Sequence, residues 1–234
     1  MADLITQKLR LDALRRVSKY PFELDLWASK SASQLQQEIF ALVFNDFKRG
    51  GFFVEFGATN GMELSNTFLL EKEFGWSGIL AEPCRNWYPA LIQNRNCIID
   101  HRCVWVETGQ KLLFNETLGP QISTIDTFSN VDFHGEGRKN GKKYEVNTIS
   151  LVDLLSEHSA PSKIDYLSID TEGSEFEILQ AFPFGKYTFN TITCEHNFSP
   201  FRGQINSLLL DNGYRRVLQE FSEFDDWYVL DARN

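Results

Sequence analysis

The sequence predicts an α/β fold with a mostly parallel, seven-stranded sheet and a reversed final strand. Three observations predict this fold. Short apolar segments alternate with helical segments from residue 50 onward, consecutive strands are connected through helices, and the last two strands are only a few residues apart. Strands connected through a helix run parallel, whereas strands joined by a short turn run antiparallel.

Residues 1–49 are expected to form a helical N-terminal cap on a main domain that spans residues 50–234. Apolar residues recur at helical spacing between residues 3 and 45, in two segments that Pro21 and residues 31–33 separate. Ser33 is the expected N-cap of the second segment, because a serine hydroxyl accepts hydrogen bonds from the free amides of a helix start. This cap is also a candidate contact for a homo-oligomer.

The main domain divides into the following expected elements. The strands of the sheet lie over residues 52–56, 78–82, 97–100, 164–170, 188–195, 215–220 and 226–230. The helices between them lie over residues 63–74, 85–94, 151–157, 174–181 and 200–212.

Residues 102–148 interrupt this alternation. Two short strands are expected over residues 104–106 and 111–114, joined at Thr108-Gly109, and a long polar loop over residues 129–143. Long loops in compact domains are typically lids or binding loops. The basic run over residues 138–143 is expected to be a solvated part of that loop.

Composition and charge exclude several classes of protein. The 234 residues include 32 acidic and 23 Lys or Arg side chains, a formal net charge of −9, so a nucleic-acid partner is not expected. Cys84, Cys97, Cys103 and Cys194 lack CxxC spacing, which argues against a structural zinc site. We recognise no signal peptide and no apolar run of about 20 residues, so we expect a cytoplasmic protein without membrane insertion.

The first strand of the main domain leads into a turn that contains two glycines. The turn reads Glu55-Phe56-Gly57-Ala58-Thr59-Asn60-Gly61. A dinucleotide site needs G-x-G-x-x-G so that the pyrophosphate rests on a helix N-terminus, whereas this turn has G-x-x-x-G after a carboxylate. The acidic residue disfavours a diphosphate and favours a ligand that carries a positive charge.

The second strand ends at Glu82, which is followed by Pro83. A carboxylate at this position can accept hydrogen bonds from both ribose hydroxyls, as in dinucleotide-binding folds. Together with the turn at Glu55, it predicts a site for a nucleoside with a cationic substituent. S-adenosylmethionine, which has a sulfonium and an ammonium group, fits this description.

Two further strands end in acidic residues and a histidine. Asp170 ends one strand and is followed by Glu172, and the next strand ends with Glu195-His196. Ligands of open α/β sheets bind at the carboxyl ends of the strands, where these residues meet. We expect Asp170, Glu195 and His196 to supply the group that deprotonates a substrate. The same three residues could instead hold Mg²⁺, and the sequence leaves both roles open.

Several segments, in order along the chain, resemble FkbM-type methyltransferases. They are residues 53–61 (Phe-Val-Glu-Phe-Gly-Ala-Thr-Asn-Gly), Ser65-Asn66-Thr67, residues 75–83, Asn94-Arg95, residues 169–175 with Ile178-Leu179, Glu195-His196-Asn197, and Asp226-Trp227-Tyr228-Val229. The resemblance spans about residues 50–230 and leaves residues 1–49 outside.

The resemblance implies a Rossmann-like class I methyltransferase fold. It also implies methyl transfer from S-adenosylmethionine to oxygen, commonly to a hydroxyl group of a sugar, a glycan or a natural product. The acceptor would then be a small molecule or a glycan. The loop over residues 129–143 has no counterpart in the family pattern, so it leaves the acceptor unidentified.

The resemblance also assigns cofactor residues. It places Glu55, Gly57, Ala58, Thr59, Asn60 and Gly61, with Ser65 in the following helix, around the methionine half of the cofactor. Glu82, followed by Pro83, would hold the ribose, and Asp170 would lie close to the sulfonium. One departure is that Ala58-Thr59 stand where the family often has an acid.

Two alternative functions are weighed against this hypothesis. An NAD-type oxidoreductase on a similar sheet would need the G-x-G-x-x-G turn that is missing here. A non-catalytic binding domain would be expected to lose the acidic residues at the strand ends, which this chain retains. Trp87, Trp105 and Trp227 are candidates for stacking on a sugar face, although packing in the core or at the rim is the favoured role of each.

Overall fold

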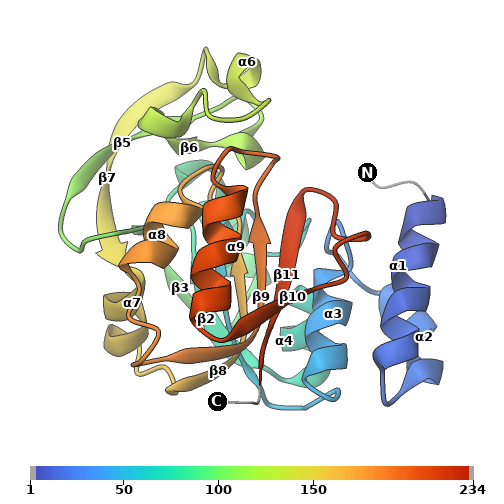
Figure 1. The fold of residues 1–234 in the computed structure, drawn as a ribbon. Helices are drawn as coiled ribbons and strands as arrows, with labels where there is room; N and C mark the ends of the chain where they lie inside the picture. Colours follow the sequence, from blue (N-terminus) through green and yellow to red (C-terminus); the bar gives the residue numbers. More distant parts are fainter. Residues whose placement is uncertain (1–3, 232–234) are drawn as a thin grey trace.

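A seven-stranded sheet forms the centre of the structure, a computed structural model that describes residues 4–231 (Figure 1). In spatial order its strands are β10 (Tyr214–Val217), β11 (Asp225–Leu230), β9 (Thr188–Glu195), β8 (Lys163–Ile169), β1 (Phe52–Phe56), β2 (Ser77–Ala81) and β3 (Ile98–Asp100). Strand β11 pairs antiparallel with both β10 and β9, and the other neighbours pair parallel. The predicted mostly parallel sheet with a reversed final strand is therefore confirmed.

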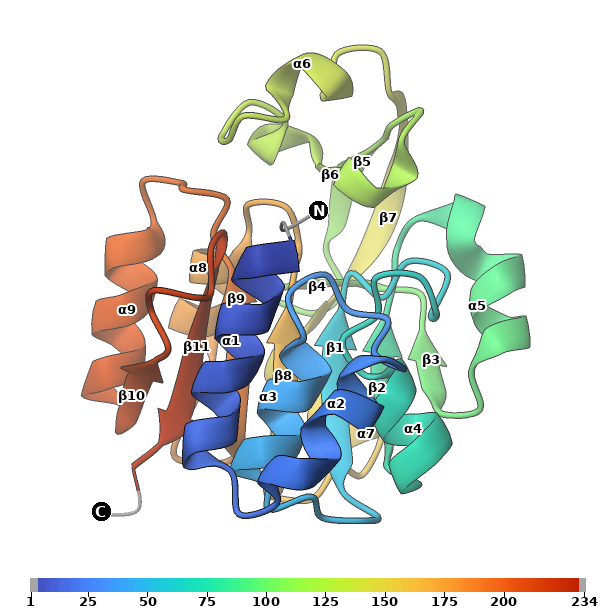
Figure 2. The same cartoon turned by 90° about the vertical axis from the view of Figure 1, so that its right-hand side faces the viewer.

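Helices cover both faces of this sheet (Figure 2). One face is covered by α1 (Leu4–Val17), α2 (Leu24–Ala28), α3 (Gln37–Phe44), α4 (Phe68–Phe74) and α5 (Tyr88–Asn94), and the other by α7 (Leu151–Glu157), α8 (Glu175–Ala181) and α9 (Arg202–Asp211). Successive strand residues point to opposite faces, so Phe53 packs in the first layer and Val54 in the second. Among residues 4–231, no helix is both long and apolar enough to cross a membrane.

Of the N-terminal helices, α3 packs on the sheet, and α1 and α2 pack against α3. Short η1 (Pro21–Glu23) separates α1 from α2, and the buried side chains of α3 belong to the same apolar cluster as Phe53 and Trp227. The prediction that Ser33 caps the second helix is wrong, because α3 begins after Gln36, whose φ is 61°. The division at residue 49 stays a prediction, and the predicted helix start at residue 3 lies outside the described residues.

A second sheet of four strands lies beyond the carboxyl ends of β1, β2 and β8 (Figures 1 and 2). From here on, the cap means residues 103–150 and not the N-terminal helices. It contains β4 (Cys103–Trp105), β5 (Lys111–Glu116), η3 (Pro120–Ile122), β6 (Thr124–Ile125), η4 (Asp126–Phe128), α6 (Gly135–Arg138) and β7 (Lys142–Ser150). Its strand order is β4-β7-β5-β6. The two predicted short strands exist, but they do not pair with each other, because β7 lies between them.

Two predicted elements differ from the structure near the sheet edge. The helix expected over residues 63–74 begins only at Phe68, because the backbone before it turns to hydrogen-bond Glu55. The helix expected over residues 85–94 is η2 (Arg85–Trp87) followed by α5. Residues 57–67, between β1 and α4, therefore form an irregular turn around the Glu55 side chain. This turn forms one wall of the candidate active site.

Candidate active site

A cavity of about 270 Å³ lies between the carboxyl ends of the main strands and the cap. The N-terminal segment contributes Gln34 to its lining. The main strands and the turns after them contribute Glu55, Phe56, Gly57, Thr59, Leu64, Asn66, Ala81, Glu82, Pro83, Trp87, Asp170, Thr171, Glu172, Ser174, Glu195, Asn197 and Phe224, and the cap contributes Cys103, Val104, Phe114, Pro120, Gln121, Ile122, Ser123, Ile125, Phe133 and His134. This is the edge at which open α/β sheets bind ligands.

The backbone around the cavity adopts conformations that side chains disfavour. Four residues that line it have positive φ angles without being glycine: Thr59 (48°), Leu64 (63°), Glu172 (60°) and Asn197 (42°). Such strain collects at functional sites, where the surrounding structure holds it in place. Gly57 also has a positive φ, of 74°, and a Cβ there would overlap the carbonyl oxygen of Asp170.

Glu55 is buried at the end of β1, and its carboxylate organises the turn that follows. It accepts hydrogen bonds from the Asn66 amide (2.7 Å) and from the Ser65 (3.1 Å) and Thr67 hydroxyls. The Arg95 guanidinium lies 3.8 Å from the same carboxylate. Burial raises the pKa of Glu55, and Arg95 opposes that rise. Glu55 therefore lines the cavity and also fixes its wall.

Glu82 lies at the end of β2 and accepts two backbone hydrogen bonds. The Thr59 amide donates to Oε2 and the Cys84 amide to Oε1, each at 2.8 Å. Burial raises the pKa of Glu82 to about 8, in spite of both amides. The carboxylate thus joins the turns after β1 and β2 while it faces the cavity.

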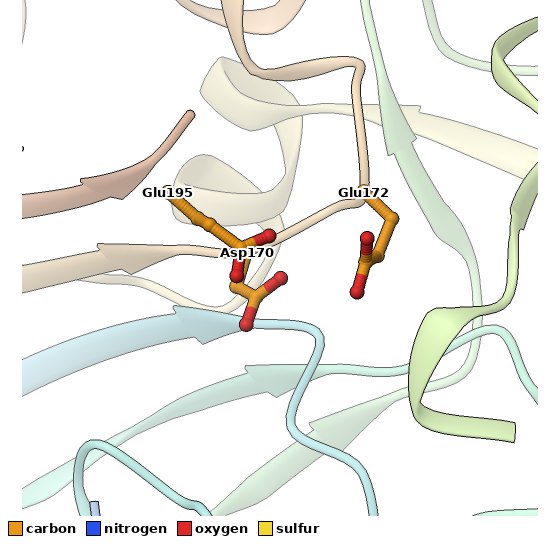
Figure 3. A group of neighbouring side chains, drawn as sticks. All are labelled: Asp170, Glu172 and Glu195. Atoms are coloured by element: carbon orange, nitrogen blue, oxygen red, sulfur yellow. The ribbon is translucent and has the colours of Figure 1, made fainter. Parts of the chain in front are cut away.

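Three carboxyl groups from β8, β9 and the loop after β8 meet in the cavity (Figure 3). One oxygen from each of Asp170, Glu172 and Glu195 lies within 4.8 Å of the others. Burial raises the pKa of all three acids, and their mutual repulsion adds to the rise for Glu172 and Glu195. The interaction between Asp170 and Glu195 lowers the pKa of Asp170 and raises the pKa of Glu195.

A cation from the cap reaches this group of acids. The buried Arg138 guanidinium donates to Glu172 at 2.6 Å and pairs with both oxygens of Asp132 within the cap. Asn197 Nδ2 donates to Glu172 at 3.3 Å and to Glu195 at 2.6 Å. The expectation that the basic run is solvated is therefore wrong for Arg138, which is 1% exposed.

The predicted base His196 lies apart from the carboxyl pair. It does not line the cavity, and its Nδ1 accepts a hydrogen bond from the Phe198 amide at 3.0 Å. Its Nε2 has no hydrogen-bond partner and lies 3.8 Å from Asp226. Burial lowers the pKa of His196 to about 4, so the ring is neutral at pH 7.

The predicted cofactor residues divide into two groups. Glu55, Gly57, Thr59, Glu82, Pro83 and Asp170 line the cavity, whereas Ala58, Asn60, Gly61 and Ser65 do not. The second group supports the first: Asn60 Oδ1 accepts from two following amides, and a Cβ on Gly61 would overlap Arg95 and Leu91. Their individual roles toward a cofactor stay predictions.

Sequence reasoning missed several cavity residues. Asn66 lines the cavity while its neighbour Ser65 turns away from it, and the only signal was the Ser-Asn-Thr motif itself. The apolar cap residues Ile122, Ile125 and Phe133 carried no motif. Of the three tryptophans, Trp87 lines the cavity, Trp105 packs against Phe128, and Trp227 is fully buried.

Comparison with solved structures identifies similar folds. The methyltransferase FkbM of Methylobacillus flagellatus KT has a TM-score of 0.50 at 12% identity, with 97% of this chain and 60% of that chain covered. This chain therefore spans 60% of that protein's length. The precorrin-6y C5,15-methyltransferase of Geobacter metallireducens GS-15 has a TM-score of 0.44 at 10% identity, with 76% of this chain and 70% of that chain covered. A comparison with curated protein sequences found no match.

The sequence itself matches a known family over most of its length. Residues 55–226 match the methyltransferase FkbM domain. The matched range begins at the acid that ends β1 and contains every carboxylate that lines the cavity. It also contains the whole cap, and it leaves the N-terminal helices outside. The chain belongs to the FkbM methyltransferase family, as its resemblance in sequence predicted.

Proposed function

We propose that this protein is an S-adenosylmethionine-dependent O-methyltransferase that acts on a hydroxyl group of a sugar, a glycan or a natural product. The observation that carries the proposal is the placement of Glu82. It ends β2, faces the cavity and is fixed by the Thr59 and Cys84 amides. A fixed carboxylate at a second strand end is suited to accept hydrogen bonds from two ribose hydroxyls.

The residues around the turn after β1 fit the rest of that cofactor. The approach of Gly57 to Asp170 leaves no side chain between the two strand ends. The carboxylates of Glu55 and Asp170 favour a ligand with a positive charge. When bound, S-adenosylmethionine would supply an electrophilic methyl group on its sulfonium.

We assign proton removal from the acceptor to the Asp170–Glu195 pair. A carboxyl group with a raised pKa is a better proton acceptor near neutral pH than an ordinary carboxylate, and both groups face the cavity. Asn197 holds Glu195 from the far side. We give His196 a packing role, because its free nitrogen points toward Asp226 and the ring does not line the cavity.

The three carboxyl groups are a poor fit for a divalent cation. Glu172 is already paired with Arg138, and Asn197 donates to two of the three acids. A bound Mg²⁺ would need these lone pairs and would face the guanidinium. We therefore expect methyl transfer to continue in the presence of a chelator.

Calorimetric titration tests the proposal. The purified protein should bind S-adenosylmethionine saturably and should not bind NAD. Production of S-adenosylhomocysteine with hydroxyl-bearing acceptors would then be measured with and without chelator. Folded protein that binds NAD, or that binds neither compound, contradicts the proposed function.

A further inference from the structure

Several backbone amides beside the cavity already have carboxyl groups as partners, and these groups belong to the protein itself. Backbone amides in the turns of α/β folds commonly bind phosphate. Here Glu82 takes the Thr59 and Cys84 amides, and Glu55 takes the Asn66 amide. The protein's own carboxylates fill the positions at which an anionic ligand would bind.

The same arrangement recurs after β8 and at the start of α4. Glu175 Oε1 accepts from the amides of Thr171 (2.9 Å) and Gly173 (3.0 Å) in the loop beside the cavity. The buried Glu38 accepts from the Leu69 amide at 2.6 Å, in the first turn of α4. Five backbone amides in three segments around the cavity, and a sixth in α4, therefore donate to carboxylates.

The cavity wall also lacks a compensating cation. Among the described residues that line it, five are Asp or Glu and none is Lys or Arg. His134 is the one histidine among these lining residues. Burial lowers the pKa of His134, so that it favours the neutral form. Arg138, the cation that reaches the acids from the cap, is paired with Glu172 and Asp132 and does not line the cavity.

One buried polar atom is left for a ligand, and it is an acceptor. Asn66 is 8% exposed, and its Nδ2 donates to the Ser168 hydroxyl at 2.9 Å. Its Oδ1 is buried without a hydrogen-bond partner, on a side chain that lines the cavity. An unpaired buried carbonyl is stabilised by a ligand O–H or N–H, and repels a phosphate oxygen.

From these observations we infer that the cavity selects acceptors by charge. The acceptor presents hydroxyl or ammonium groups to the cavity, and a phosphate on the part that enters is rejected. This inference rests on the proposed methyl transfer for its substrate class, but the charge selection is a property of the cavity alone. The inference excludes nucleotide-linked and phosphorylated sugars as acceptors if their phosphate group must enter the cavity.

Binding of inorganic pyrophosphate tests the inference without an acceptor. The protein, free and with S-adenosylhomocysteine, is titrated calorimetrically with pyrophosphate, and we expect no saturable binding with a Kd below about 1 mM. Gln121→Lys places a cation on the cavity wall and should gain pyrophosphate affinity. Gln204→Lys on the exposed surface of α9 is the matched control and should not. Pyrophosphate binding by the unchanged protein that Gln121→Glu abolishes would overturn the inference.

Methyl transfer provides the second test. Methyl glucoside, glucosamine and glucose 6-phosphate are compared at equal concentration by S-adenosylhomocysteine formation. The phosphorylated sugar should react at least about tenfold more slowly than the faster of the other two, because the cavity lining offers a buried phosphate no Lys or Arg side chain. Equal or faster reaction of the phosphate contradicts the charge selection. Failure of S-adenosylmethionine to bind contradicts the proposed function instead, and leaves the pyrophosphate result to decide the inference.

Discussion

At the residue scale, a few side chains both shape the cavity and face it. Glu82 joins two turns through the Thr59 and Cys84 amides, and Glu55 joins β1 to the turn before α4. Gly57 does the same without a side chain, because it lets that turn pass against the carbonyl of Asp170. Substitutions here must therefore be separated into effects on binding and effects on folding.

Replacing Glu82 with Ala should weaken S-adenosylmethionine binding by about tenfold to a hundredfold, since hydrogen bonds to a charged group contribute about 1.5–3 kcal/mol. The loss of its two amide contacts will also lower the melting temperature. Glu82→Gln keeps one acceptor oxygen and the side-chain volume, so it should fold better while still binding weakly. Calorimetric affinity and thermal unfolding of both variants, beside Glu63→Ala on the exposed part of the turn, check this. Unchanged affinity in both would remove Glu82 from the cofactor site.

Replacing Gly57 with Ala should destabilise the protein more than replacing Gly75 with Ala. Both glycines have positive φ angles, of 74° and 66°, but a Cβ on Gly75 meets nothing within 4 Å. Gly75→Ala therefore costs only the left-handed backbone, about 1–2 kcal/mol. Gly57→Ala adds an overlap with backbone that cannot move freely. Urea unfolding measures the difference, and equal free energies of unfolding would contradict the close approach at Gly57.

At the element scale, the main sheet could be predicted from sequence and the cap could not. The main strands are apolar segments with helices between them, because both faces of the sheet are covered. Strand β7 has an exposed side, and within Lys142–Ser150 polar and apolar residues alternate over residues 143–147. The residues that it pairs with lie 26 to 45 positions before their partners, so no short turn in the sequence indicates the pairing.

In the candidate site, Arg138 is a residue whose role could not be predicted from the sequence. In the sequence it stands in a basic run beside three lysines, which is typical of a solvated loop. Its partner Glu172 lies 34 residues away, and only the packing of the cap against the loop after β8 brings them together. The strand-end acids could be predicted because the topology alone places them at one edge of the sheet.

Replacing Arg138 with Met should separate the cap from the main domain. It leaves Asp132 and Glu172 buried without their cation, and breaking a buried pair costs about 3–5 kcal/mol. Lys139→Met, which removes a neighbouring exposed lysine, should leave the free energy of unfolding nearly unchanged. Because burial raises the pKa of Glu172, protonation neutralises this acid as the pH falls, and the cost of Arg138→Met should shrink. An effect no larger than that of Lys139→Met would show that the pair does not hold the cap.

At the scale of the whole molecule, the chain buries more carboxyl groups than its cations neutralise. Burial raises the pKa of Glu38 to about 7, of Glu82 to about 8 and of Asp225 to about 7. Fewer acids have a lowered pKa in the folded protein. At Glu71 burial raises the pKa, but the interactions with Lys72 and Arg95 outweigh burial and lower it to about 2. The folded protein consequently holds protons that the unfolded chain has released.

The stability of the unliganded protein should therefore fall as the pH rises from about 5 to about 8. An acid whose pKa is raised in the folded state contributes stability that is fully present below its unfolded pKa and is lost as the pH rises through the folded value. When the folded and unfolded pKa values of one acid differ by about 1, the free energy of unfolding changes by about 1.4 kcal/mol, so each such acid should lower the melting temperature by about 3–6 °C. Asp225→Asn retains an acceptor for Gln37 and Trp227, and should reduce this slope, whereas Asp211→Asn on the surface should not. Thermal unfolding between pH 5 and 8.5 measures it. A melting temperature that rises over this range would mean that these carboxyl groups are ionised in the folded protein. Saturation with the cationic cofactor should flatten the slope as well, because it offsets the charge that burial disfavours.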